Sequence, residues 1–238
     1  MSTVNPIIVA VDVPAIEPAI GLVRSLAPHV GAFKVGLELF NAVGARIFDA
    51  LREAAGGGVN IFYDAKFHDI PNTVAGAVRA AVRHNIWMTN IHASGGSAMM
   101  KAAVEAAQTA SGQRPLVIAV TVLTSIDDAT LSGELGVNRT AAEQVVALAR
   151  LAQDSGCDGV VASPRETSAI REACGPEFVI VTPGVRPVGA ALGDQKRVMT
   201  PAEAIAQGAS YLVIGRPITG APDPAQAAIA IGREIGIG

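Results

Sequence analysis

Apolar runs of strand length alternate with alanine-rich, helix-like stretches along the chain, and this alternation limits the possible folds more than any other feature. It is typical of repeated strand–helix units, in which each helix crosses over a parallel sheet. The expected strands are Ile7–Val13, Ala32–Leu37, Val59–Asp64, Trp87–His92, Leu116–Leu123, Gly159–Ser163, Phe178–Pro183 and Tyr211–Gly215. The expected helices are Ala15–Ala27, Asn41–Ala55, Thr73–His84, Gly96–Ala110, Thr140–Asp154, Pro164–Ala173, Pro201–Gln207 and Pro224–Glu234.

This pattern predicts a single-domain α/β fold, a (β/α)8 barrel of the TIM type over residues 1–238, with the active site at the C-terminal ends of the strands. Hydrophobic residues make up 50% of the chain but aromatic residues only 4%, so Ala, Val, Ile and Leu must build the core. Parallel strands buried on both faces require such a composition. The alternative is an open doubly wound sheet, but no Gly-x-Gly-x-x-Gly follows the first strand, where a dinucleotide site would place it.

Charge and cysteine content narrow the classes of partner. A formal net charge of -3 gives no electrostatic reason to expect nucleic acid or an anionic membrane surface. No apolar run reaches membrane-spanning length, and the N-terminus lacks the pattern of a secretory signal. Cys157 and Cys174 have neither metal-ligand spacing nor the number that a disulfide framework needs. We therefore expect a cytoplasmic protein that acts on a small molecule.

Charged residues gather where the apolar strands end. The sequence holds four lysines, and two of them, Lys34 and Lys66, lie at ends of apolar strands. An ammonium without partners would be costly there, and Asp12 and Asp64 are the natural partners. Barrel closure predicts an array that alternates in sign as Asp12, Lys34, Asp64, Lys66. A purely structural ring of ion pairs is the alternative, but buried ion pairs stabilise a fold so poorly that a functional role explains them better.

Lys66 is the candidate acid of this array, because a turn that caps a helix follows it at once. Asp69 lies in that turn, before Pro71. The competing interpretation of this segment is an ion pair at a strand end followed by a helix cap at Asp69 or Asn72.

A phosphate site is expected beside the array. Gly184 and Gly215 close the last two strands, where barrels of this type commonly bind phosphate through backbone N–H groups. Arg186, Gln195 and Arg216 add polar and cationic side chains. Two long connections, 124–139 and 184–200, also follow strand ends, as binding loops or lids do. His68 and His92 form no recognised ligand spacing with the nearby aspartates, so no metal is expected.

These residues closely resemble the signature of the orotidine 5'-monophosphate decarboxylase family, which Asp64-Ala65-Lys66-Phe67-His68-Asp69-Ile70-Pro71-Asn72-Thr73 carries here. The likeness extends over essentially the whole chain. It includes Val11–Val13, Phe33–Gly36, Val120–Ser125, Thr182–Pro187, Gly193–Arg197 and Ile214–Ile218.

The resemblance implies decarboxylation of orotidine 5'-monophosphate to UMP, the last step of de novo pyrimidine nucleotide synthesis, without a cofactor. It implies that Lys66 donates the proton, with Asp64 and Lys34 in the charge array. It also implies a catalytic homodimer, in which Asp69 reaches the site of the partner subunit. The substrate-binding residues that it implies are Asp12 and Lys34 at the ribose, Thr124 at the pyrimidine, Arg186, Gln195, Gly215 and Arg216 at the phosphate end, and Asp64, Lys66, Asp69, Ile70 and Thr73 of the signature.

One position departs from the family pattern. Ala65 stands where the family usually has a larger apolar residue, and strand alternation turns its side chain away from the mouth of the barrel. Two other functions stay open at this stage. One is a Mg²⁺-dependent sugar-phosphate decarboxylase or aldolase on a related barrel, and the other is a regulatory barrel that binds a phosphate ligand without catalysis.

Overall fold

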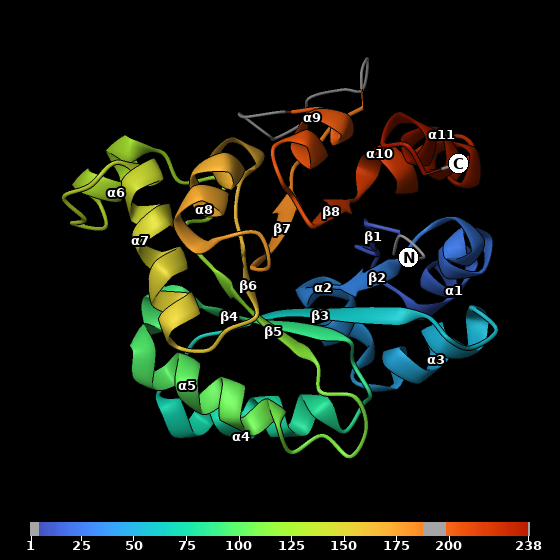
Figure 1. Ribbon diagram of the computed structural model, residues 1–238. Helices are drawn as coiled ribbons and strands as arrows, with labels where there is room; N and C mark the ends of the chain where they lie inside the picture. The colour runs from blue at the N-terminus through green and yellow to red at the C-terminus, as the bar shows by residue number, and fades with distance from the viewer. Residues whose placement is uncertain (1–4, 188–198, 238) are drawn as a thin grey trace.

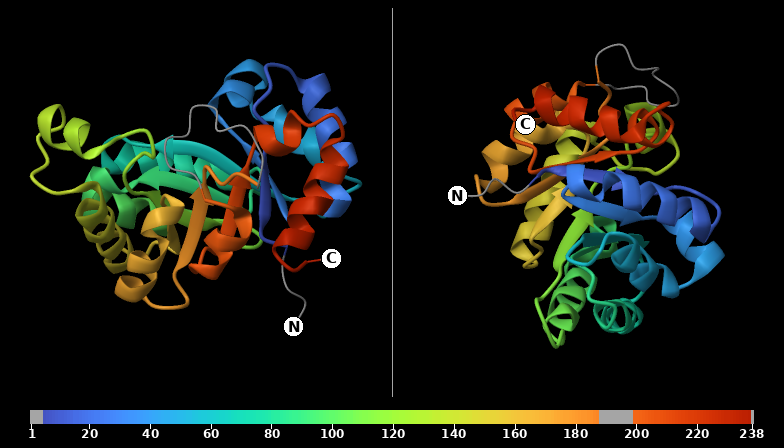
Figure 2. Two further views of the ribbon diagram at one scale, coloured as in Figure 1. Left: turned by 90° about the horizontal axis from the view of Figure 1, so that it is seen from above. Right: turned by 90° about the vertical axis from the view of Figure 1, so that its right-hand side faces the viewer.

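The computed structural model describes residues 5–187 and 199–237 and shows a closed barrel of eight parallel strands, which confirms the predicted fold. Each strand pairs with its neighbour in the sequence, and β1 closes the barrel against β8. The helices surround the strands on the outside (Figures 1 and 2). The strands are β1 Ile7–Ala10, β2 Ala32–Val35, β3 Asn60–Phe67, β4 Met88–His92, β5 Leu116–Val120, β6 Gly159–Val161, β7 Val179–Pro183 and β8 Tyr211–Ile214.

The helices follow the predicted order with two kinds of difference. The helix expected over 41–55 is two helices, because Gly44 adopts a left-handed φ of 75° and ends the first of them. Two short helices, α6 and α10, were not predicted, since neither is long enough to show an amphipathic period. The α-helices are α1 Ile16–Leu26, α2 Leu37–Val43, α3 Arg46–Ala54, α4 Pro71–Val82, α5 Gly96–Ala107, α6 Asp128–Gly133, α7 Ala141–Asp154, α8 Thr167–Cys174, α9 Pro201–Ala206, α10 Arg216–Thr219 and α11 Pro224–Glu234. Single 3-10 turns lie at Ala27–His29, Ala93–Gly95 and Pro164–Glu166.

The strands are buried on both faces, as the apolar composition predicts. In β1, Ile8 belongs to the cluster inside the barrel, while Ile7 and Val9 pack outward beneath the helices. Trp87 and Tyr211 pack edge to face against one another, with ring centroids 5.0 Å apart. Both pack against the inner cluster at the N-terminal ends of the strands. The interior is therefore filled at the N-terminal ends of the strands, and polar groups gather at the other end.

Strand β3 is distorted where it reaches that end. Its register with β4 pairs Tyr63 with Thr89 and then Phe67 with Ile91, so β3 advances four residues while β4 advances two. Lys66 within this bulge has a φ of 50°, in the left-handed region. Extra residues in one strand bend it and redirect its side chains. The bulge thus decides where the charged residues of β3 point.

Candidate active site

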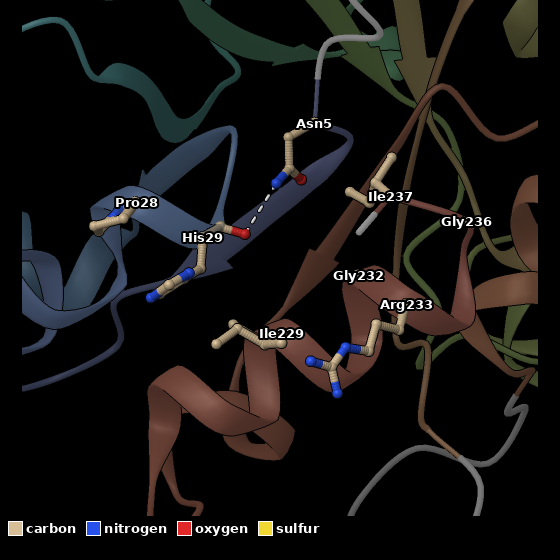
Figure 3. Close-up of a pocket in the computed structure, with 9 residues that line it drawn as sticks. Asn5, Pro28, His29, Ile229, Gly232, Arg233, Gly236 and Ile237 are labelled. Atoms are coloured by element: carbon tan, nitrogen blue, oxygen red, sulfur yellow. Dashed lines mark hydrogen bonds between the residues drawn. The ribbon is translucent and has the colours of Figure 1, made fainter.

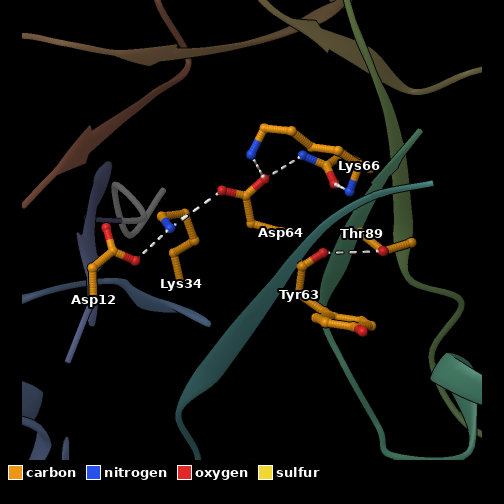
Figure 4. A network of polar contacts seen from close by, with 7 residues as sticks. Asp12, Lys34, Tyr63, Asp64, Lys66 and Thr89 are labelled. Carbon is orange, nitrogen blue, oxygen red and sulfur yellow. Dashed lines mark hydrogen bonds and ion pairs between the residues drawn. The ribbon is translucent and has the colours of Figure 1, made fainter. Parts of the chain in front are cut away.

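Four charged side chains form a continuous chain of contacts at the C-terminal end of the barrel (Figure 4). Lys34 Nζ lies 3.0 Å from Asp12 Oδ1 and 3.2 Å from Asp64 Oδ2. Lys66 Nζ lies 2.6 Å from Asp64 Oδ1. The structure therefore brings together the four residues of the predicted array, in the predicted alternation of sign.

Burial differs along this chain of charges. Lys34 and Asp64 are 7% and 8% exposed, whereas about half of the Asp12 side chain and a third of the Lys66 side chain are open to solvent. Gly36, which follows β2, allows Asp12 and Lys34 to pair, because a Cβ at this position would lie 2.9 Å from both Asp12 Oδ1 and Lys34 Nζ. Lys34 and Asp64 thus form the buried centre of the chain of charges, and Asp12 and Lys66 at its two ends face the solvent-accessible mouth.

Electrostatics keep the two buried groups charged. Burial alone would raise the pKa of Asp64, but Lys34 and Lys66 outweigh it and hold that pKa below its ordinary value. Burial likewise works to lower the pKa of Lys34, but Asp64 and Asp12 outweigh it, and the pKa is raised overall. At neutral pH the site therefore presents fixed charges of both signs.

Asn90 of β4 was not singled out from the sequence, yet it joins the array. Its Nδ2 donates to Asp64 Oδ1 at 2.7 Å, and its Oδ1 accepts from the backbone N–H of Lys66 at 2.7 Å. The signal in the sequence is an asparagine in the middle of an apolar strand, since such a residue must find buried partners.

An apolar cavity of about 200 Å³ opens beside the array. Lys34, Asp64 and Lys66 form its charged side, and Thr124 of the connection after β5 also lines it. Apolar side chains complete the wall, and these include Phe62, Val120, Val161, Val181 and Val213. The cavity could accept a flat, mostly unsaturated ring with one edge toward the charges.

A second cavity, of about 430 Å³, contains the cationic groups. Gly184, Arg186, Gly215 and Arg216 line it, and it shares Lys34 with the apolar cavity. Burial lowers the pKa of Arg186, and the nearby charge of Arg216 lowers it further. Two guanidinium groups that repel one another beside backbone glycines suit a bound anion. Gln195, the remaining predicted phosphate ligand, lies outside the described residues.

Asp69, Ile70 and Thr73 form an exposed group at the beginning of α4. The Asp69 carboxylate accepts a hydrogen bond from the N–H of Ile70 at 2.6 Å and, within the described part of this chain, makes no ion pair with Lys66. Ile70, 67% exposed, is the N-cap residue of α4 and supplies no side-chain cap. The alternative that Asp69 or Asn72 caps this helix is therefore wrong.

The two histidines beside Lys66 face one another, with ring centroids 5.3 Å apart. Burial lowers the pKa of His92, and His68 and Lys66 lower it further. Within residues 5–187 and 199–237, no three His, Cys, Asp or Glu side chains are grouped closely enough to hold a metal ion. Ser163, another polar residue at a strand end, caps the turn Pro164–Glu166 in a capping box with Glu166.

Another hollow, drawn in Figure 3, lies among the residues that precede the first two strands, at the opposite end of the barrel. It measures about 520 Å³ and lies between the segments that precede β1 and β2 and the end of α11. In its wall, Asn5 Nδ2 donates a hydrogen bond to the carbonyl of His29 (Figure 3). Because it lies at the N-terminal ends of the strands, it is remote from the charge array and contributes nothing to that site.

Comparison with known proteins agrees with this geometry. Residues 5–231 match the family described as "Orotidine 5'-phosphate decarboxylase / HUMPS family". The chain belongs to this family. Within the described residues, no helix has the length and apolar character needed to cross a membrane.

Relatives in the orotidine 5'-phosphate decarboxylase / HUMPS family are similar over nearly their full length. The orotidine 5'-phosphate decarboxylase of Moorella thermoacetica is 57% identical over 239 residues, which cover 99% of this chain and 94% of that protein. The enzyme of the same name from Dichelobacter nodosus is 56% identical over 227 residues, 95% of this chain and 97% of that protein. The crystal structure of orotidine 5'-phosphate decarboxylase from Lactobacillus acidophilus superposes with a TM-score of 0.86 at 39% identity, covering 98% of this chain and 99% of that one.

Proposed function

We propose that this protein decarboxylates orotidine 5'-monophosphate to UMP, the last step of de novo pyrimidine nucleotide synthesis, in the cytoplasm. The observation that carries the proposal is the contact of Lys66 Nζ with Asp64 Oδ1, 2.6 Å apart at the charged side of an apolar cavity. The family and its curated relatives support the same substrate.

The two cavities suggest how the nucleotide binds. The pyrimidine enters the apolar cavity, where Thr124 meets its polar edge. The phosphate occupies the second cavity, against Arg186, Arg216 and the backbone of Gly215. Lys34 lines both cavities and pairs with Asp12, so these two side chains lie where the ribose hydroxyls connect ring and phosphate.

The chemistry then follows from the fixed charges. Breaking the bond from C6 to the carboxylate releases carbon dioxide and leaves the electron pair on C6, in the ring plane. The Lys66 ammonium stabilises this carbanion and transfers a proton from Nζ to C6, which gives UMP. Asp64 aims this ammonium and is itself held by Lys34, and Asp64 also stands beside the departing carboxylate. Contacts with the phosphate convert binding energy far from the ring into positioning at C6.

The exposed group Asp69, Ile70 and Thr73 is the part of the site that we assign to the partner subunit of a homodimer. Its exposure at the start of α4, next to the strand that carries Lys66, supports this assignment. In such a dimer, a Lys66→Ala chain and an Asp69→Ala chain would form one intact site per mixed dimer. Mixing the two inactive variants should thus restore about a quarter of wild-type activity, because half of the dimers are mixed and each has one intact site of two.

The decisive experiment follows the ultraviolet absorbance of orotidine 5'-monophosphate as it becomes UMP. Wild-type protein should convert the substrate. The control Lys101→Ala, a change at an exposed lysine of α5, should convert it as well. Lys66→Ala should lose at least about a thousandfold in kcat while keeping its fold. Near-normal turnover by Lys66→Ala would refute the assigned mechanism. Loss of wild-type activity in EDTA would favour the Mg²⁺-dependent alternative.

A further inference from the structure

We propose that Asn90 is a positioning residue for this reaction: its buried amide holds the backbone of Lys66 and the carboxylate of Asp64 in the arrangement that proton transfer needs. The inference rests on the proposed function of the charge array and adds a residue to it. Asn90 is 0% exposed and acts through the two residues that it contacts.

The bulge in β3 creates the need for such a residue. Between the pairs Tyr63–Thr89 and Phe67–Ile91, three residues of β3 face Asn90 alone. A bulge leaves backbone groups without ladder partners. Lys66 is also held at a φ of 50°, which costs a residue with a side chain about 1 kcal/mol or more and persists only where the surroundings enforce it.

The amide of Asn90 meets both needs at once. Its Oδ1 accepts from the Lys66 N–H, and its Nδ2 donates to Asp64 Oδ1, both at 2.7 Å. A backbone N–H can only donate and a carboxylate can only accept, so a single orientation of the amide satisfies both contacts. One side chain therefore ties the strained backbone of the proton donor to the carboxylate that aims it.

The same oxygen of Asp64 also receives Lys66 Nζ, at 2.6 Å. Without Asn90, that carboxylate would lose one of the bonds that fix its plane, and the Lys66 N–H would lose its acceptor inside the barrel. Both the backbone and the ammonium group of Lys66 would then be less constrained. A displacement of about 1 Å at a reacting group can reduce the rate about a hundredfold.

Thr89 provides a matched control within the same bulge. It is 0% exposed, and its Oγ1 donates to the carbonyl of Tyr63 at 3.1 Å, so it also supports the distorted strand. Its hydrogen bond goes to neither Asp64 nor Lys66. Thr89→Val therefore perturbs the bulge without removing a contact of the charge array.

The first experiment compares kcat, KM and thermal stability of Asn90→Leu and Thr89→Val. Asn90→Leu should lower kcat about 10- to 100-fold with KM within about threefold, since the lost interaction serves the transition state. Thr89→Val should lower the melting temperature but keep kcat within about threefold. A folded Asn90→Leu protein with kcat within threefold of wild type, or equal losses of kcat in both variants, would overturn the inference.

A second variant, Asn90→Asp, carries the test if Asn90→Leu does not fold. Burial and the facing Asp64 should raise the pKa of the introduced carboxyl, and the ammonium groups of Lys66 and Lys34, which already pair with Asp64, should offset only part of this rise. While protonated it can still donate to Asp64, and once ionised it repels Asp64. The ratio of its kcat to that of wild type should therefore fall as pH rises. A ratio independent of pH would contradict the positioning role.

Failure of the proposed function has a separate signature, namely wild-type protein that does not decarboxylate the nucleotide. In that case a crystal structure of Asn90→Leu tests the positioning by itself. The inference predicts that Lys66 leaves its left-handed conformation or that Nζ leaves Asp64. Retention of both would overturn it.

Discussion

The substitution Arg171→Met should lower the stability of the fold and leave the activity almost unchanged. Arg171 lies on α8, near the N-terminal ends of the strands, and its guanidinium joins the end of that helix to the segments that precede β7 and β8. Nη1 donates to carbonyl oxygens at 2.7 to 2.8 Å, and Nη2 donates to one carbonyl at 2.6 Å and to one hydroxyl at 3.4 Å. These partners are Gly175, Pro176 and Phe178 for Nη1, and Gly208 and Ser210 for Nη2.

The expected loss can be worked out from these contacts. Nη1 has two hydrogens for three carbonyls, so the guanidinium makes about three full bonds. A hydrogen bond from a charged donor contributes about 1.5–3 kcal/mol net. Desolvation opposes this gain, and the lowered pKa of Arg171 reflects the burial of the group. We therefore expect Arg171→Met to cost about 3 kcal/mol, which corresponds to a fall in melting temperature of roughly 6–12 °C for a chain of this size.

Urea unfolding measures this loss as a lower midpoint at an unchanged slope. Arg150→Met, at an exposed position of α7, is the matched control and should stay within about 0.5 kcal/mol of wild type. Arg171→Lys should fall between them, because one ammonium cannot reach both segments. The kcat/KM of Arg171→Met should remain within about twofold, since the proposed active site lies at the other end of the barrel. A loss below about 1 kcal/mol relative to Arg150→Met would refute this reasoning.

The order and number of the strands could be predicted because each strand is apolar on both faces and each crossover is amphipathic. The residues at which the strands end, at the mouth of the barrel, could not be predicted. The apolar run predicted as Leu116–Leu123 ends as a strand at Val120, and Val122 and Leu123 line the cavity instead. An apolar wall for a ligand and an apolar strand look alike in a sequence, so the pattern continues beyond the point where pairing stops.

The charge array could be predicted because a buried ammonium needs carboxylate partners, and only a few charged residues follow the strands. The backbone that carries Lys66 could not be predicted, since strand alternation assumes a regular strand and β3 has a bulge there. Nor could the sequence show that Asn90 replaces the missing ladder partner of Lys66. The role proposed for Asp69 requires a second copy of the chain, so it stays a prediction.

Three further predictions concern the active site. Gly36→Ala should raise KM several-fold with the melting temperature within about 2 °C, because the added Cβ must separate Asp12 from Lys34; an unchanged KM would contradict this. UMP at 100 times its Kd should stabilise wild-type protein by about 2.7 kcal/mol, and a thermal-shift assay should show that Arg186→Met loses most of this effect. Below about pH 4, the free energy of unfolding should fall more steeply for wild type than for Asp64→Asn. Asp64 has a lowered pKa in the folded protein, so its contribution is present above the unfolded pKa of about 3.9 and is lost as pH falls through the folded value. Urea titrations over a pH series measure both slopes, and parallel slopes would mean that the Lys34 and Lys66 ammonium groups do not favour the ionised carboxylate of Asp64.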